Sequence, residues 1–260
     1  MSSAPSFHYH ANAHALSGHI TRPANHLIQV QAGTALPSMG GQHTAHVENF
    51  RLDQTVSFAG GYSHVAGSEK IENNKTTHTT LVTTAIENLN ILDMVTADRI
   101  VARLASSHES GQETRILVLG SRFENLRIAG YKIDVELHHE LALKLDTFAA
   151  ARKEFESNAD FRKMADDPFE PGKLPKKVEA HEDIRCSLVK ELQPKTCPGI
   201  MRRGHCGHVL VVPEFGKVYL AEIHFEHGRK TLTMLRVELG SPNGGNLIVA
   251  QAESNGRPPT

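Results

Sequence analysis

The chain has 260 residues and 17 histidines, and its densest group of metal-ligand residue types lies around position 206. His205, Cys206 and His208 stand almost side by side there, and His224 follows downstream. Imidazole nitrogen and thiolate sulfur are ligands that zinc accepts readily in proteins. The sequence therefore predicts a candidate zinc site made of His205, Cys206, His208 and His224. Three further residues of the same types flank this group: His181, Cys197 and His227.

The spacing of this His/Cys cluster leaves a second interpretation open. It contains no C-x-x-C pair, and the pattern matches no standard zinc motif. The cluster could instead be a polar loop whose thiols are free or form one disulfide. With only Cys186, Cys197 and Cys206 present, at most one disulfide can form within a chain, so no disulfide framework is predicted. On this interpretation the protein has no cofactor, and zinc is the alternative.

Other arrangements capable of chemistry are weaker. His8, His10 and His14 lie on one parity of an expected strand from 7 to 18, which predicts a polar strand face rather than a metal site. His138 and His139 are adjacent, so in a strand their rings would point to opposite faces. The sequence contains no Gly-x-Ser-x-Gly nucleophile elbow and no phosphate-binding glycine loop. No catalytic residue is predicted.

A repeated pattern gives the first indication of the strands that position these residues. Residues 47–52, 86–91 and 123–128 each read apolar, Glu, Asn, apolar, polar, apolar. The two polar residues in the middle break the period-two alternation of a regular strand. Asn tolerates left-handed backbone, so each copy is expected to form a bulge or corner with apolar side chains on both sides facing one core. The pattern predicts a sandwich with repeated strand corners, or alternatively a short β-solenoid.

Residues 146–164 differ in character from the β-rich part before them. Phe148, Ala151, Phe155 and Ala159 follow one another at spacings of three and four, which predicts one helix, ended by Asp166-Asp167-Pro168. A Pro- and Lys-rich loop is expected over 169–177. The segment 146–207 is therefore interpreted as a helix and loop inserted into a β domain.

The strand predictions give the chain three parts. Residues 1–145 form a β-rich region, in which 76–104 makes two strands joined near 92–94. Residues 208–260 supply C-terminal strands that complete the β domain, including a hairpin about 227–229. The fold class is mainly β, sandwich-like, with a helix-containing insertion.

Composition restricts the partners. Lys+Arg 28 and Asp+Glu 29 give a formal charge of −1, so no overall field attracts nucleic acid. With Trp 0 and Tyr 4, platforms for stacking bases are scarce. Apolar runs are too short to span a membrane. The N-terminus shows no signal peptide, so by sequence the protein is cytoplasmic or has had a signal removed, and both compartments stay open.

Two segments of the β-rich region carry a resemblance. Residues 89–102, followed by a polar turn and residues 123–130, resemble the choice-of-anchor group of bacterial β-rich surface proteins, especially the P type. Ala35-Leu36-Pro37 and Gly40-Gly41 are also similar, and the resemblance covers about residues 7–135. It implies a secreted or cell-surface β module without known catalytic residues. The chain departs from that group in lacking a visible signal and sorting tail and in its charged helical segment.

These observations predict a non-catalytic structural or interaction β-protein that self-associates or is displayed at a surface. The alternative is a metal-binding protein or metal-dependent hydrolase that uses the His/Cys cluster between 181 and 227. We expect enzyme activity only in the second case.

Overall fold

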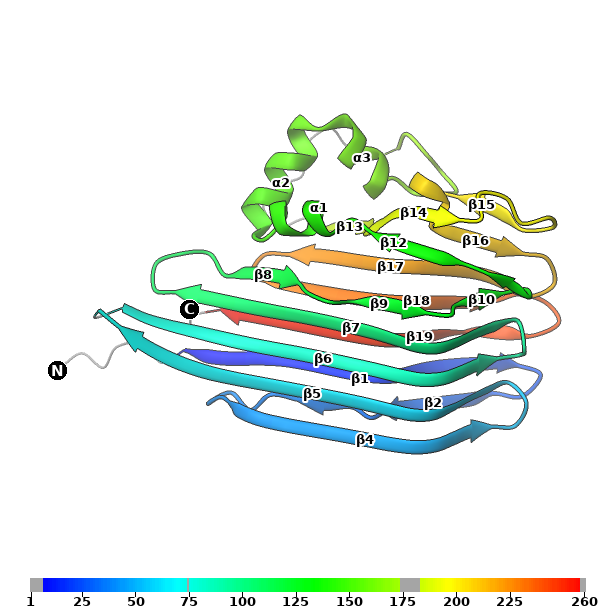
Figure 1. Cartoon of the computed structure of the whole chain (residues 1–260), viewed down its shortest axis with the longest axis horizontal. Coiled ribbons are helices and arrows are strands. Elements are labelled where there is room, and N and C mark those ends of the chain that lie inside the picture. Colours follow the sequence, from blue (N-terminus) through cyan, green and yellow to red (C-terminus); the bar gives the residue numbers. More distant parts are fainter. Residues whose placement is uncertain (1–6, 74, 174–182, 258–260) are drawn as a thin grey trace.

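The computed structural model describes residues 7–73, 75–173 and 183–257. It is mainly β, with two large sheets stacked face to face as a sandwich (Figure 1). The predicted sandwich-like fold is confirmed. Every strand pairing between described residues is antiparallel, whereas the coils of a solenoid pair as parallel strands. The solenoid alternative is therefore wrong.

Nine strands of the described chain form the first sheet, and eight form the second. The nine-stranded sheet holds β15 (Met201–Arg203), β16 (Val209–Val212), β17 (Gly216–Glu226), β18 (Arg229–Leu239), β19 (Gly244–Arg257), β1 (His8–Arg22) and β2 (His26–Gln31) in that order, with β13 (Ile184–Ser187) beside β17 and β3 (Thr34–Ala35) beside β1. The eight-stranded sheet holds β11 (Tyr131–Lys132), β10 (Arg127–Ile128), β7 (Val95–Glu109), β6 (Lys75–Ile91), β5 (Val56–Glu72) and β4 (Gly41–Leu52), with β8 (Arg115–Val118) and β9 (Arg122–Glu124) beside β7. A small third sheet pairs β12 (Asp134–Leu137) with β14 (Val189–Gln193).

The core lies between the two large sheets. β19 packs on β6 and β7, and β1 packs on β5 and β6. β1 illustrates the sequence rule behind this packing: Tyr9, Ala11 and Ala13 are buried, while His8 and His10, on the other parity, are exposed. Alternate side chains of a strand face opposite sides, so the predicted His-lined polar face of β1 is confirmed.

The first two Glu-Asn copies lie on β4 and β6, and the third begins in β9 and ends in β10. β4, β6 and β9 run in the same direction within one sheet. Asn49, Asn88 and Asn125 have φ angles of 53°, 51° and 49°. Ile86 and Leu89 are both buried, although three positions apart in a regular strand they would face opposite sides. The predicted left-handed Asn, with apolar residues on both sides facing the core, is confirmed. The predicted joint near 92–94 is confirmed too, since it links β6 to β7.

The helices differ from the prediction in one respect. The helix expected over 146–164 is divided at Asn158 into α2 (Phe148–Ser157) and α3 (Ala159–Ala165). The Asn158 side chain accepts hydrogen bonds from the backbone N–H groups of Asp160 and Phe161 and so starts a new helix. Ala159, expected on the apolar face, is exposed, and Phe161 takes the core position instead.

A short helix α1 (His139–Lys144) begins where a strand was expected. The ring of His138 caps it, because Nδ1 accepts a hydrogen bond from the backbone N–H of Leu141 at 3.3 Å. The strand prediction at 138–140 is therefore wrong. The segment 146–207 also contributes β13, β14 and β15, and a 3-10 turn, His205–Gly207, precedes β16.

Part of the predicted loop over 169–177, namely 174–177, lies outside the described residues, as does His181. The hairpin expected about 227–229 is confirmed as the β17–β18 connection. None of the helices in the described ranges is long and apolar enough to cross a membrane.

Candidate functional site

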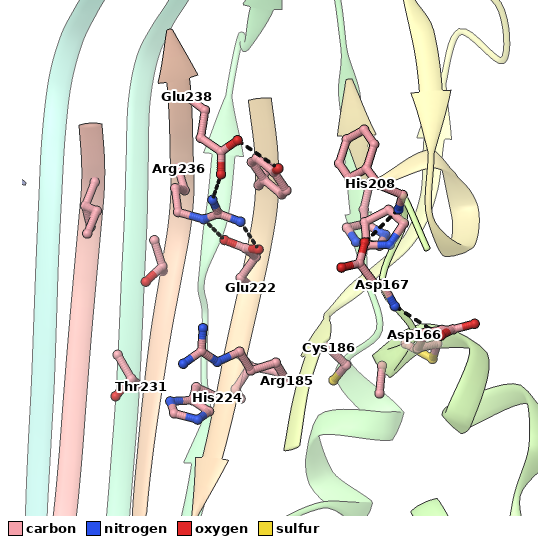
Figure 2. Close-up of a pocket in the computed structure, with 18 of the residues that line it drawn as sticks. Asp166, Asp167, Arg185, Cys186, His208, Glu222, His224, Thr231, Arg236 and Glu238 are labelled. Carbon is pink, nitrogen blue, oxygen red and sulfur yellow. Dashed lines mark hydrogen bonds and ion pairs between the residues drawn. The ribbon is translucent and has the colours of Figure 1, made fainter. Parts of the chain in front are cut away.

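A pocket of about 610 Å³ lies over the strands β17, β18 and β19. Its other walls are β13 and the segment that follows α3 (Figure 2). Side chains that line it, such as Tyr219 and Arg236, alternate with the fully buried core residues Leu220 and Leu235. The pocket is therefore on the side of the sheet opposite the core, and its size is typical of sites for small organic ligands.

A left-handed residue in β17 brings the pocket side chains to one face. Tyr219 and Glu222 both line the pocket although they are three positions apart. Between them Ala221 has a φ of 49°, and this left-handed residue reverses the alternation of the strand. Its carbonyl oxygen accepts a hydrogen bond from the backbone N–H of Leu188 at 2.9 Å, which fixes the chain leaving β13 beside the pocket. Ala250, with a φ of 50°, interrupts β19 in the same way.

Arg236 is the centre of the charged network on the pocket floor. Its Nε and Nη2 donate to the two carboxylate oxygens of Glu222 at 2.6 and 2.8 Å, and its Nη1 donates to Glu238. The guanidinium lies 3.5 Å from the ring centroid of Tyr219. The Tyr219 hydroxyl donates to Glu238 at 3.1 Å. A fork-shaped guanidinium between two carboxylates and an aromatic face is held in one orientation.

The charges of this network control its ionisation. Burial disfavours the charge on Arg236, but the hydrogen bonds and charges of Glu222 and Glu238 outweigh it and raise the pKa of Arg236. Burial and the neighbouring Glu238 raise the pKa of Tyr219 to about 12. For Glu238, burial is outweighed by Arg236, so its pKa is lowered. Arg236 and Glu238 therefore stay ionised at neutral pH, with Tyr219 as a hydrogen-bond donor.

A second polar group lies further along β17. His224 Nε2 is hydrogen-bonded to Asp183, and Arg185 Nε lies 3.4 Å from the same carboxylate. Burial alone would raise the pKa of Asp183, but the hydrogen bond with His224 and the charge of Arg185 lower it. The side chain of Arg185 is largely exposed, so this end of the pocket is open to solvent.

His208 lines the pocket opposite the Arg236 network in Figure 2. Its side chain is buried, and Nδ1 donates to the carbonyl oxygen of His205 at 2.8 Å. Burial lowers the pKa of His208, although the His205 carbonyl and the charge of Glu222 act in the opposite direction. A neutral ring protonated at Nδ1 has its lone pair on Nε2. Nε2 has no hydrogen-bond partner among the described residues, so it is a hydrogen-bond acceptor available to the pocket.

The structure brings together two of the four predicted zinc ligands. His208 and His224 line the pocket, whereas His205 and Cys206 do not. Cys206 is exposed as a residue. The partial burial of its sulfur, together with the charge of Glu191, raises the pKa of the thiol. The three cysteines are free thiols. Across 7–73, 75–173 and 183–257, no group of three or more His, Cys, Asp or Glu side chains is placed to hold a metal ion.

The arrangement favours binding over covalent chemistry. Both oxygens of Glu222 are engaged by Arg236. The thiol that lines the pocket, Cys186, is buried, which raises its pKa to about 12 and keeps it protonated. A thiol rather than a thiolate is a poor nucleophile. What the pocket offers a ligand is charge, hydrogen-bond acceptors and apolar walls.

Comparison with known proteins gives one match. A family model described as "Domain of unknown function (DUF8256)" matches residues 7–226. The chain belongs to this family. No curated protein and no solved structure matches. The DUF8256 match ends at the last residue of β17, so β18 and β19, which carry Arg236 and half of the pocket floor, lie beyond it.

Sequence patterns in this DUF8256 chain did not indicate Tyr219, Glu222, Arg236 and Glu238. The available signal was a break of period two in β17, where two polar pocket residues stand three positions apart. That break resembles the one in the Glu-Asn copies. Its left-handed residue is Ala221 rather than Asn, so residue type gave no indication of it.

Proposed function

We propose that this DUF8256 chain is a non-catalytic interaction protein that self-associates through the end of the sandwich where β2 and β4 are the outermost strands. β2 ends the order of the nine-stranded sheet and β4 ends the order of the eight-stranded sheet. Figure 1 places both at the same end of the molecule. An outermost strand presents unpaired backbone N–H and C=O groups to any strand that approaches it.

The exposed apolar edge of β2 is the observation that carries this proposal. Leu27 and Val30 have 74% and 58% of their surface exposed. The sequence of β2, HLIQVQ, contains no Lys, Arg, Asp, Glu or Pro. Charged residues and proline are the usual means by which proteins protect an edge from pairing. β2 lacks them and exposes two branched aliphatic side chains, so association of this edge removes apolar surface from water.

A second copy of the chain is the partner that fits this end. A two-fold contact brings the same patch together from both subunits, which requires a surface complementary to itself. β2 contains no Lys, Arg, Asp or Glu, so no pair of such like charges opposes the approach of a second β2. β4 carries both signs of potential charge close together, with His46 Nε2 3.8 Å from a carboxylate oxygen of Glu48. Antiparallel pairing of two β4 strands about their middle would set unlike groups opposite each other, and both sheets would continue into the second copy.

The alternative, a metal-dependent hydrolase, has less support. It needs three or more ligands in one place, and the part of the chain that is described brings together only His208 and His224 of the predicted set. One further candidate ligand of this alternative, His181, lies outside that part.

The test is the native mass, measured by light scattering after size exclusion at several concentrations. For a subunit of 28.5 kDa, we expect a mass of at least two subunits that falls on dilution. The double substitution Leu27→Lys with Val30→Lys should shift the protein to monomer, because it places like charges on facing edges. Ile71→Lys is the matched control, since Ile71 is 67% exposed on β5 but lies beyond Gly67, where the pairing of β5 with β4 ends.

Circular dichroism should show that all three proteins keep the same β content. A wild type that stays monomeric at every concentration would refute the proposal. So would a double variant with the same mass distribution as the Ile71→Lys control.

A further inference from the structure

The charges that line the pocket do not balance. Two guanidinium groups, those of Arg185 and Arg236, face four carboxylates. The carboxylates belong to Asp166, Asp167, Glu222 and Glu238. Taking +2 from the arginines and −4 from the acids, the lining has a formal charge of −2. A concave site with excess negative charge raises the local concentration of cations.

Lys217 indicates which kind of cation suits the rim. Its Nζ lies 3.3 Å from a carboxylate oxygen of Glu238 and 4.2 Å from the centroid of the Phe169 ring. Both of these partners line the pocket, whereas Lys217 itself does not. A carboxylate and an aromatic face together form a favourable environment for an ammonium group. The rim is thus already complementary to a primary amine in its protonated form, supplied here by the chain's own lysine.

The interior of the pocket supplies acceptors and apolar walls. His208 is only 5% exposed, and the acceptor Nε2 described above is the polar atom that it presents. The carboxylate of Asp167 uses Oδ1 to accept from the backbone N–H groups of Phe169 and Glu170. Its second oxygen has no hydrogen-bond partner among the residues described. Met164, Ile223 and Ile248 give the walls aliphatic surface.

We propose that this pocket binds a small linear aliphatic diamine or polyamine. Its ammonium groups provide donors for the acceptors in the lining, and its methylene chain contacts the aliphatic walls. A volume of about 610 Å³ is sufficient for a ligand of this size. The ligand's positive charge offsets the −2 of the lining. The inference is independent of self-association, because the pocket lies over β17, β18 and β19 and not at the β2 and β4 edges.

The experiment is isothermal titration of the whole chain with 1,5-diaminopentane. The uncharged isostere 1,5-pentanediol separates charge from shape. We expect heat of binding for the diamine, none for the diol, and weaker diamine binding as salt is raised. Spermidine, with more positive charge, should bind more tightly than 1,5-diaminopentane. Binding of the diol as tight as that of the diamine would overturn the proposal, as would the absence of diamine binding at millimolar concentration.

Two substitutions locate the binding in the pocket. Asp167→Asn removes one negative charge but keeps an oxygen to accept from Phe169, and it should weaken diamine binding about fivefold. Glu170→Gln is the matched control on the same segment, since Glu170 pairs with Lys173 and does not line the pocket. It should leave the affinity unchanged. Equal effects of these two substitutions would overturn the assignment of the site.

Lys217→Gln is expected to change the diamine affinity in the direction opposite to Asp167→Asn. Removing the ammonium group that occupies the rim frees Glu238 and Phe169 for the ligand, so diamine binding should become tighter, again by about fivefold. A purely structural role for Lys217 would leave the affinity unchanged or reduce it, and either result would contradict the proposal. Native light scattering should show that none of these substitutions changes the association state.

Discussion

Lys230 makes a quantitative prediction about stability possible, because it is a lysine buried in the core of the fold. It is only 3% exposed. Its Nζ donates to the carbonyl oxygen of Ile116 at 2.6 Å and to that of Leu145, so it ties β18 to β8 and to the end of α1. Burial lowers its pKa from 10.5 to about 7, against the smaller opposing effects of Asp146 and Glu113. A shift of this size corresponds to about 5 kcal/mol.

The sign of the pH dependence follows from linkage. Between about pH 7 and 10.5 the folded protein has released the Lys230 proton, while the unfolded chain still binds it. The free energy of unfolding therefore rises with pH in this window. From about pH 6 to 8.5, the contribution of Lys230 alone increases by about 2 kcal/mol.

Substituting Lys230→Met keeps an unbranched side chain, one heavy atom shorter than lysine, and removes the titrating group. Urea unfolding at each pH, followed by circular dichroism, gives the free energy of unfolding for the wild type and the variant. Between about pH 6 and 8.5, the wild type should gain about 2 kcal/mol more than the variant. The histidines titrate in both proteins, so their effect cancels in this difference.

The exposed Lys70, paired with Glu72, provides the control. Lys70→Met should leave the pH profile parallel to that of the wild type. Parallel profiles for wild type and Lys230→Met would refute the reasoning. They would mean that the two carbonyl oxygens keep Lys230 charged in the folded protein despite its burial.

Two further predictions concern single positions. Of the three thiols, Cys206 is exposed while Cys186 and Cys197 are buried, so a thiol reagent should label one cysteine in the native protein and all three after unfolding. Fast labelling of more than one would contradict the burial. At the left-handed, exposed Asn88, replacement by Ala should lower the free energy of unfolding by about 1 kcal/mol relative to replacement by Gly. Equal stabilities of the Ala and Gly variants in urea unfolding would show that the left-handed backbone is not maintained.

The sandwich could be predicted from sequence because the alternation of buried and exposed side chains along a strand is visible in the local sequence. In β1 the buried and exposed residues alternate along the chain, and the joint between β6 and β7 lies where the strand pattern is interrupted. The Asn corners were also predictable, because Asn is one of the few residue types that favour left-handed backbone.

The helix break at Asn158 was not predicted. Ala159 fits the apolar spacing of a single helix, and the capping hydrogen bonds that start α3 override that spacing. The candidate site was missed for a different reason. Arg185 and Arg236 line the same pocket because β13 pairs with β17 and β17 with β18. Such long-range pairing cannot be seen in the sequence spacing of either residue.

The left-handed residue Ala221 links the pocket to the core. In the register of β17 and β18, Arg236 lies opposite Tyr219, and Glu222 lies opposite Thr233. The Arg236–Glu222 pair therefore runs diagonally between the two strands. It depends on a reversal of the alternation at Ala221 in β17 and on a second one at Met234 in β18, where Thr233 and Arg236 line the same pocket although they are three positions apart. Ala221 is itself fully buried, with its carbonyl oxygen bonded to Leu188. A change that straightens β17 would turn core residues of this strand outward and would at the same time separate Glu222 from Arg236. The pocket therefore cannot vary independently of the packing beneath it.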